Sequence, residues 1–448
     1  MTQINRLPTL AAAIAAALVS SAAMAAETTA ASAPAPVAAP APAVAPAPAA
    51  APAPTDLVSA LTGGKAHLDF RYRYEQVDQQ GFDVDAYAST LRTRLNYTTA
   101  EWQGLTAMLE AANVVVLGQY SLYNSTTNGA TSRPVVADPE YTEINQAWLQ
   151  YKLGDYTGIG GRQVINLDNQ RFVGNVAWRQ NDQTYDAVTL KVGSIPRTQL
   201  FYSWVGNVNR VTGPDNGTFP GNLSGSSNLL NARVDLGAGG ALSLFGYWLD
   251  FDRNQPYAAA VTNNLSSSTY GAYYTGAWQS SAAVKLNATG SYAHQQDDGQ
   301  STLDYDADYW LVEGSAAINH LGIRAGYEVL GGNTRANTTG FQTPLATLHI
   351  FQGWADKFTT TPQQGVEDFY VGASANFEGV VMQLVYHDFQ AEAVDQDFGT
   401  EWDASVAYKF AKRFEATLKY ANYDAARDAT GPQASDTTKT WVMLSASF

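Results

Sequence analysis

A period of two in side-chain character runs from Lys65 to the end of the chain, and this pattern limits the possible folds more than any other feature. In "AHLDFRYRYE" (66–75), Phe70, Tyr72 and Tyr74 alternate with ionisable residues. Successive side chains of a β-strand point to opposite faces of a sheet, so the pattern predicts a strand with one aromatic and one charged face. Segments such as "STLRTRLNYT" (89–98), "GIRAGYEV" (322–329) and "EWDASVAYKF" (401–410) repeat it.

The connections between these segments alternate between short turns and long polar loops. The short turns are expected near 99–102, 154–156, 193–198, 237–240, 278–283, 319–322, 377–380 and 411–413, and the long loops at 76–85, 118–140, 166–183, 206–227, 252–267, 296–304, 332–368, 391–400 and 424–438. Tight periplasmic turns and long extracellular loops are typical of outer-membrane barrels. The sequence therefore predicts an all-β, antiparallel transmembrane β-barrel of about eighteen strands, with sixteen as the alternative. The apolar face would meet lipid and the charged face would line a wet lumen.

Composition excludes several other classes of protein. The formal net charge is −15, which argues against nucleic acid as a partner. The chain has no cysteine, so disulfides and thiolate metal sites are excluded. The 25 tyrosines and 10 tryptophans suit membrane–water interfaces, because their rings have an apolar body and a polar tip.

The N-terminal region predicts export. Arg6, the apolar run "LAAAIAAALVSSAAMAA" and a small-residue cleavage motif at Ala23–Ala25 indicate a signal peptide over 1–26; a membrane anchor is the alternative, but the run is short for a span. The Ala/Pro-rich segment that follows predicts a disordered periplasmic linker over 27–64, or else a docking arm for a periplasmic partner. The barrel would then occupy 65–448 in the outer membrane of a Gram-negative bacterium.

Two loop motifs are more specific than the alternation. They are "GRQVINLDNQRFVGNVAWRQNDQTYD" (161–186) and "FQTPLATLHIFQGWADKFTTTPQQGVEDFYVG" (341–372). With "ASTLRTRLNY" and "ADPEYTEINQAWLQY", they make 65–448 resemble the alginate-export-domain family of outer-membrane proteins. The resemblance implies an eighteen-strand barrel, and its best-understood type secretes an anionic polysaccharide through an arginine-lined constriction. It also implies lumen-side positions for Arg71, Arg73, Arg92, Arg94 and Arg162, and places Arg171 and Arg179 in the matching loop motif.

The inward-facing bases form a candidate solute path. Arginine stays charged and grips carboxylates in a fork, so a row of arginines would attract anions. The alternative is mutual neutralisation by acidic residues on the same face. The candidate basic strip comprises Arg71, Arg73, Arg92, Arg94, Arg162, Arg171, Arg179 and Arg324, with Arg233 and Lys285 further round, and its candidate acidic partners are Asp69, Glu75, Glu110 and Glu328, with Asp235 and Asp403 also on this face.

The loop 341–369 is unusually apolar for an extracellular loop. Its apolar residues would be poorly solvated in water, so we expect it to fold into the barrel mouth and narrow the pore, with loop 166–183 packed nearby. A compact external cap is the alternative. The candidate constriction residues are Phe341, Leu345, His349, Trp354, Asp356 and Lys357.

Signals of catalysis and metal binding are weak. The five histidines are scattered and none has zinc spacing. The acidic loop at Asp304–Asp308 lacks the glycine and closing glutamate of an EF-hand, so a solvated loop is favoured over a calcium site.

We therefore expect a non-enzymatic outer-membrane channel that needs no cofactor. It would pass small hydrophilic solutes, with anions favoured, or an acidic polysaccharide by diffusion, in contact with lipid and lipopolysaccharide. The alternative is a plugged structural or adhesive barrel, and an outer-membrane hydrolase is the least favoured reading.

Overall fold

The computed structural model describes residues 54–215, 220–252 and 265–448, so the expected signal peptide and most of the expected linker lie outside the described residues. The described chain forms one antiparallel sheet of 18 strands. The strands are β1 (Lys65–Gln79), β2 (Ala86–Thr98), β3 (Leu105–Val116), β4 (Tyr141–Leu153), β5 (Tyr156–Gln163), β6 (Thr184–Val192), β7 (Thr198–Asn209), β8 (Asn222–Asp235), β9 (Ala241–Leu249), β10 (Ser267–Ser281), β11 (Val284–Asp297), β12 (Asp306–Ile318), β13 (Leu321–Leu330), β14 (Val366–Phe377), β15 (Val380–Gln390), β16 (Asp397–Phe410), β17 (Phe414–Ala425) and β18 (Thr437–Ser447).

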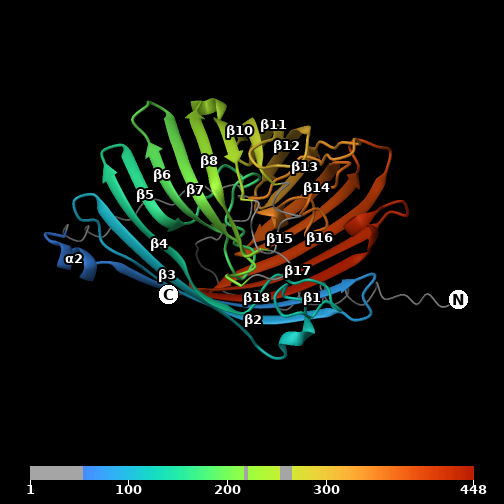
Figure 1. The fold of residues 1–448 in the computed structure, drawn as a ribbon, viewed down its shortest axis with the longest axis horizontal. Coiled ribbons are helices and arrows are strands. Elements are labelled where there is room, and N and C mark those ends of the chain that lie inside the picture. The colour runs from blue at the N-terminus through green and yellow to red at the C-terminus, as the bar shows by residue number, and fades with distance from the viewer. Residues whose placement is uncertain (1–53, 216–219, 253–264) are drawn as a thin grey trace.

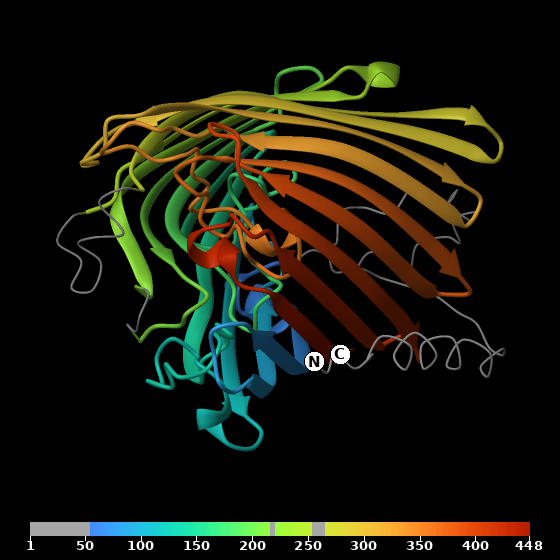
Figure 2. The same ribbon diagram turned by 90° about the vertical axis from the view of Figure 1, so that its right-hand side faces the viewer.

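The sheet closes into a barrel because its first and last strands pair with each other. Every strand pairs with its neighbours in sequence, and β1 pairs with β18 from Asp69 opposite Ser447 to Gln79 opposite Thr437. Figures 1 and 2 show the resulting ring of tilted strands from two directions. Closure leaves no unpaired sheet edge, which satisfies the backbone hydrogen-bonding groups within lipid. The predicted eighteen-strand barrel is confirmed.

The two faces of the strands differ as the alternation predicted. Large apolar side chains on the outward face are exposed, such as Leu95, Leu149 and Val312. Tyr72 lies opposite Leu91 and Leu444 on this outward face, whereas Arg71 lies opposite Arg92 on the inward face. The outward band therefore meets lipid, and the polar face lines the lumen.

Connections also alternate as expected. The connections that follow the even-numbered strands have two to six residues, whereas those that follow the odd-numbered strands have six to 35. The β1–β2 and β15–β16 connections are shorter than expected, because their strands extend further. In the two-residue turn between β14 and β15, Glu378 and Gly379 have φ of 49° and 84°, as a tight hairpin turn requires. The long loops contain the short 3₁₀ segments η1 (Tyr120–Leu122), η4 (Leu348–Ile350) and η5 (Gly431–Ala434), while η2 (Gly237–Gly239) lies in a short turn.

The end of the expected disordered linker is ordered. Helix α2 (Leu57–Thr62) occupies part of it, because "LVSALT" contains no proline and Asp56 caps the first turn. None of the described helices is long and apolar enough to cross a membrane.

Candidate functional site

Two long loops fold into the lumen. The β5–β6 loop (residues 164–183) and the β13–β14 loop (residues 331–365) lie within the ring of strands, where Figure 1 shows them in green and orange. Phe341 and Leu345 are fully buried, and Trp354 and Phe358 are buried almost as deeply. The apolar side chains of the β13–β14 loop therefore pack inside the barrel.

The two loops are joined to each other. Val173 and Leu345 form a parallel β-bridge, and the amide of Gly174 donates to the carbonyl of Leu345 at 2.8 Å. The Trp178 ring stacks on His349 with centroids 4.2 Å apart and planes only 4° from parallel. The loops thus form one unit, which we call the lumen plate (residues 164–183 and 331–365).

Arginines of the expected basic strip fasten the lumen plate to β1 and β2. Arg71 donates from Nη1 to the carbonyl of Ala177 at 2.9 Å and also contacts the carbonyl of Arg179. Arg73 donates to the carbonyl of Trp178 at 2.5 Å and lies over the Trp178 ring, 4.3 Å from its centroid. These guanidinium groups therefore serve as anchors for loop backbone.

Carboxylates neutralise most of the remaining arginines. Arg73 is 2.8 Å from Glu75, and Arg179 is 3.2 Å from the same carboxylate. On the neighbouring strand and across the lumen, the ion pairs are Arg94–Asp182 (2.8 Å) and Arg171–Glu328 (2.7 Å).

Two arginines of the strip have no carboxylate within ion-pair distance among the described residues. They are Arg71 and Arg92, which face each other across β1 and β2. Arg71 is partly accessible, whereas Arg92 is 9% exposed. Because neither guanidinium has a carboxylate partner, the pair leaves positive charge beside the lumen plate. The two like charges, directly opposite each other, also repel.

The structure does not bring all the expected lumen residues together. Arg162 lies opposite Ala147 and Asp186, on the face that carries exposed Val188, so it points outward and pairs with Asp186 at 2.8 Å. The inward placement expected for Arg162 is therefore corrected. Its strand, "YTGIGGRQ", has glycines on the outward side, so no apolar residue marks the lipid face there.

The other expected residues lie elsewhere on the inner wall. Arg324 is 3.8 Å from Glu313 and lies over the Tyr370 ring. Asp69 pairs with His67 at 3.2 Å, and Glu110 accepts a hydrogen bond from Asn145 at 2.5 Å. Neither acid pairs with an arginine within the described residues.

Asp356 connects the lumen plate to β18. Its carboxylate accepts from Lys439 at 2.7 Å and from Arg179 at 3.2 Å, and it contacts His349 Nδ1 at 2.8 Å. Burial opposes ionisation, but Lys439, His349 and Arg179 together hold the pKa of Asp356 well below its usual range. Asp356 therefore links both loops of the lumen plate to the barrel wall through charged contacts.

The pKa values of two neighbouring loop bases are also shifted. Burial, with the nearby Lys419 charge, lowers the pKa of His349 to about 3, so its imidazole is neutral at pH 7. Burial, with the nearby Lys439 charge, lowers the pKa of Lys357 to about 8. The Lys357 ammonium donates to Ser435 and to Thr437 Oγ1 at 3.0 Å, which ties the loop to the β17–β18 loop and to β18.

Sequence reasoning missed Glu401 and Lys419 as wall residues that hold the plate; it placed Asp403 on the inward face but did not identify its partner. Glu401 accepts from the amide of Ala355 at 2.7 Å, and Asp403 accepts from the amide of Trp354 at 3.1 Å. Lys419 lies 3.6 Å from the Trp354 ring centroid and 4.1 Å from that of Trp178. Extending the period of two through β17 would have placed Lys419 inward, but nothing local indicates its tryptophan partners.

Two cavities lie on different sides of the wall. A polar cavity of about 290 Å³ lies on the inner side of β4–β7, beneath the start of the β5–β6 loop, and its lining includes Trp148, Gln150, Gln163, Lys191 and Phe201. An apolar hollow of about 720 Å³ lies over β12–β16.

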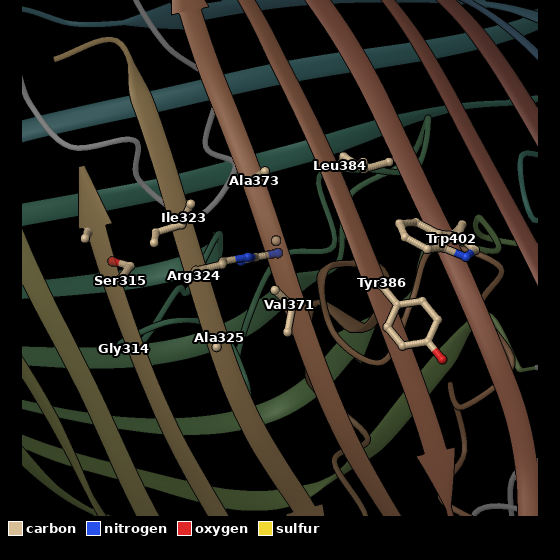
Figure 3. A pocket seen from close by; sticks show the side chains of 12 residues that line it. Gly314, Ser315, Ile323, Arg324, Ala325, Val371, Ala373, Leu384, Tyr386 and Trp402 are labelled. Atoms are coloured by element: carbon tan, nitrogen blue, oxygen red, sulfur yellow. The ribbon is translucent and has the colours of Figure 1, made fainter. Parts of the chain in front are cut away.

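The apolar hollow is part of the lipid-facing surface. Figure 3 shows its lining, in which Ile323, Val371, Leu384 and Trp402 are outward-facing and exposed. It therefore lies outside the solute path. Among the described residues, no group of three His, Cys, Asp or Glu side chains is arranged to hold a metal ion.

Comparison with solved structures supports the fold. Pseudomonas aeruginosa OpdK, solved with vanillate, has a TM-score of 0.66 and 14% identity, covering 87% of this chain and 99% of that one. Pseudomonas aeruginosa OccK9 (OpdG) has a TM-score of 0.67 and 16% identity, with the same coverage. Acinetobacter baumannii OccAB2 has a TM-score of 0.67 and 15% identity, again with 87% and 99% coverage.

Comparison of sequences identifies the family. No curated protein matches the chain. The family model described as alginate export matches residues 65–329, so the loop motif at 341–372 lies beyond the matched region. This match covers more than half of the chain, and it coincides with strands β1 to β13 of the closed barrel. The protein is an outer-membrane β-barrel and belongs to the alginate export family.

Proposed function

We propose that this protein is a passive channel for small hydrophilic solutes, with a preference for anions set beside the lumen plate. The observation that carries the proposal is the pair Arg71 and Arg92, whose charges no described carboxylate neutralises within ion-pair distance. At about 8 Å and an effective dielectric constant of about 20, one unit charge attracts an anion by roughly 2 kcal/mol before salt screening.

The lining of the lumen supports hydrophilic solutes. The inner cavity beneath the β5–β6 loop offers the amides of Gln150 and Gln163 and the ammonium of Lys191. These groups bind hydroxyl and carboxylate oxygens. OpdK was solved with vanillate, an aromatic carboxylate, so vanillate is a reasonable first solute to test.

The test separates the effect of an arginine charge on solute selectivity from its role in anchoring the lumen plate. We would reconstitute the protein in planar bilayers and measure conductance and reversal potential under a salt gradient. Arg92→Gln removes a charge from a side chain with no hydrogen bond to the lumen plate, whereas Arg71→Gln also weakens an anchor. Lys285→Gln is the matched control. Lys285 is also an inward-facing base, but it lies at the end of β11 next to the short β10–β11 turn.

We expect Arg92→Gln to reduce the anion preference and leave conductance close to the wild-type value. Lys285→Gln should leave the anion preference nearly unchanged. Equal anion selectivity in Arg92→Gln and wild type would rule out Arg92 as the source of the anion preference, while the channel function itself would stand.

A second candidate function is a plugged barrel. The interlocked, aromatic-rich packing of the lumen plate favours it, because Trp178, Trp354 and Trp441 surround Lys419 inside the barrel. A folded wild-type barrel with no conductance would support this reading. Export of an acidic polysaccharide, which the family name suggests, would require the lumen plate to move aside, because the plate occupies the lumen.

A further inference from the structure

Helix α2 is a defined element attached to the start of the barrel. The Asp56 carboxylate accepts from the amide of Ser59 at 2.7 Å, and the Ser59 hydroxyl accepts from the amide of Asp56 at 3.1 Å. This reciprocal capping box fixes the first turn of the helix directly after the Ala/Pro-rich sequence. The helix ends at Thr62, and its C-cap Gly63 lies two residues before β1 begins.

Three hydrogen bonds fasten α2 and the residue that leads into β1 to the end of β2 and the turn after it. The amide of Ala100 donates to the carbonyl of Ala60 at 3.0 Å. The Tyr97 hydroxyl donates to the carbonyl of Leu61 and accepts from the amide of Gly64 at 3.1 Å. Ala60 is buried in this junction, so the helix has a fixed position relative to the barrel rim.

The residue that holds α2 faces lipid. Tyr97 lies opposite Leu109, which is 53% exposed on the outward face. The exposed aromatic side chains of Tyr151 and Tyr156 lie at the same, turn-bearing end of β4 and β5. Tyrosines at strand ends mark the membrane–water interface of outer-membrane barrels. The attachment of α2 is therefore at the level of the periplasmic interface.

The free face of α2 is apolar. Leu57, Val58 and Leu61, at positions i, i+1 and i+4 of the helix, are 54%, 68% and 50% exposed. Figure 1 shows the helix at the outer edge of the ring of strands. An exposed apolar face on a helix beside a membrane is typical of interfacial helices, which lie in the plane of the headgroup–acyl boundary.

We propose that α2 is an interfacial anchor whose Leu57, Val58 and Leu61 side chains insert into the periplasmic leaflet of the outer membrane. Six residues are too few to bind a membrane strongly by themselves, but the barrel already holds this helix at the surface, which makes insertion intramolecular. The helix carries no basic residue, so insertion depends on apolar contact and requires no anionic lipid.

The absence of cysteine in the chain allows a direct test with one introduced label. The full-length variant Val58→Cys would carry an environment-sensitive NBD fluorophore and be reconstituted in phosphatidylcholine vesicles. The control is Asp155→Cys, an exposed position in the β4–β5 turn at the same end of the barrel. Quenching by lipids with a nitroxide near the top of the acyl chain would be compared with quenching by aqueous iodide.

We expect the label at position 58 to emit at shorter wavelength than the label at position 155, to be quenched by the nitroxide lipid and to be protected from iodide. Adding Leu57→Ser and Leu61→Ser should abolish lipid quenching while the far-UV circular dichroism spectrum of the same preparation, identical to that of the wild type, shows that the barrel is folded. Iodide quenching equal to that at position 155 would overturn the proposal. Protection from both quenchers would also overturn it, because protein rather than lipid would then cover the helix.

Discussion

Replacing Asp356 with asparagine should release the lumen plate from the barrel wall. Asp356 is the carboxylate shared by Arg179 of the β5–β6 loop and Lys439 of β18, and it also contacts His349 of its own loop. Asparagine keeps the shape and one acceptor oxygen but removes the negative charge. Arg179 retains Glu75 at 3.2 Å, whereas the only ion pair that Lys439 makes among the described residues is with Asp356.

The size of the effect follows from the burial of Lys439. Its ammonium lies in a site where the residue is only 5% exposed. Removing one partner of a buried ion pair costs about 3 kcal/mol or more, because the other charge is left uncompensated. A loss of about 3 kcal/mol raises the ratio of detached to docked plate by roughly 150-fold, since 1.36 kcal/mol corresponds to a factor of ten.

Single-channel recording in planar bilayers measures this change. We expect Asp356→Asn to show larger and noisier conductance than wild type, and trypsin to cleave after Lys357, which is buried in the docked plate. Asp306→Asn is the control, because Asp306 forms an exposed pair with Arg335 at 3.7 Å and its loss should change little. Adding Lys439→Met to Asp356→Asn should partly restore the wild-type conductance, since the uncompensated charge is then gone. Identical conductance and cleavage in Asp356→Asn and Asp306→Asn would refute the conclusion that Asp356 holds the lumen plate to the wall.

Two further predictions concern the same loop. Burial, with the Lys419 charge, lowers the pKa of His349 to about 3 in the docked loop, and detachment into water would return it to about 6.5. Between these two pH values, His349 binds a proton in the detached loop but not in the docked loop. Docking of the lumen plate therefore weakens by about 1.4 kcal/mol for each pH unit below about 6.5. Conductance of the wild type should thus rise and become noisier from pH 6.5 to pH 4, and His349→Gln should remove this pH dependence; a variant with the wild-type pH profile would contradict the assignment. Gly353 has a φ of 76°, and a Cβ there would overlap the Glu401 carboxylate, so Gly353→Ala should weaken docking by at least about 1 kcal/mol. Gly379→Ala is the control, because it introduces the same kind of backbone strain in a turn without a contact to Glu401. If the current trace of Gly353→Ala equals that of the wild type, the contact with Glu401 does not contribute to docking.

The strands and their faces were predictable because the relevant signal is local. The alternation of Phe70, Tyr72 and Tyr74 with charged residues decides which side of β1 meets lipid, and the structure confirms it. The short and long connections were equally visible, since turn residues such as Gly379 act within two or three positions of the chain. The same local rule misplaced Arg162, because glycines at 158 and 160 leave its strand without an apolar outward face. It also missed α2, whose capping box lies at the edge of an Ala/Pro-rich segment.

The partners of the charged residues were not predictable from local patterns. Arg73 contacts the carbonyl of Trp178, 105 residues away, and Arg171 contacts Glu328, 157 residues away. An inward-facing arginine looks the same in sequence whether it binds solute, a carboxylate or a loop carbonyl. Only the folded loops decide among these roles, because they bring backbone oxygens to the wall.

The sequence by itself determined a closed barrel, its lipid-facing and lumen-facing sides, and the infolding of an apolar loop. Each of these follows from side-chain polarity at regular spacing, which acts along one strand or one loop. Only the tertiary structure decided that Asp356 joins Arg179, Lys439 and His349, and that Arg71 and Arg92 keep charges without a carboxylate partner within the described chain. The physical reason is that ion pairing depends on which side chains meet across the lumen, and that meeting is set by barrel closure and by the folding of two loops that are distant in sequence.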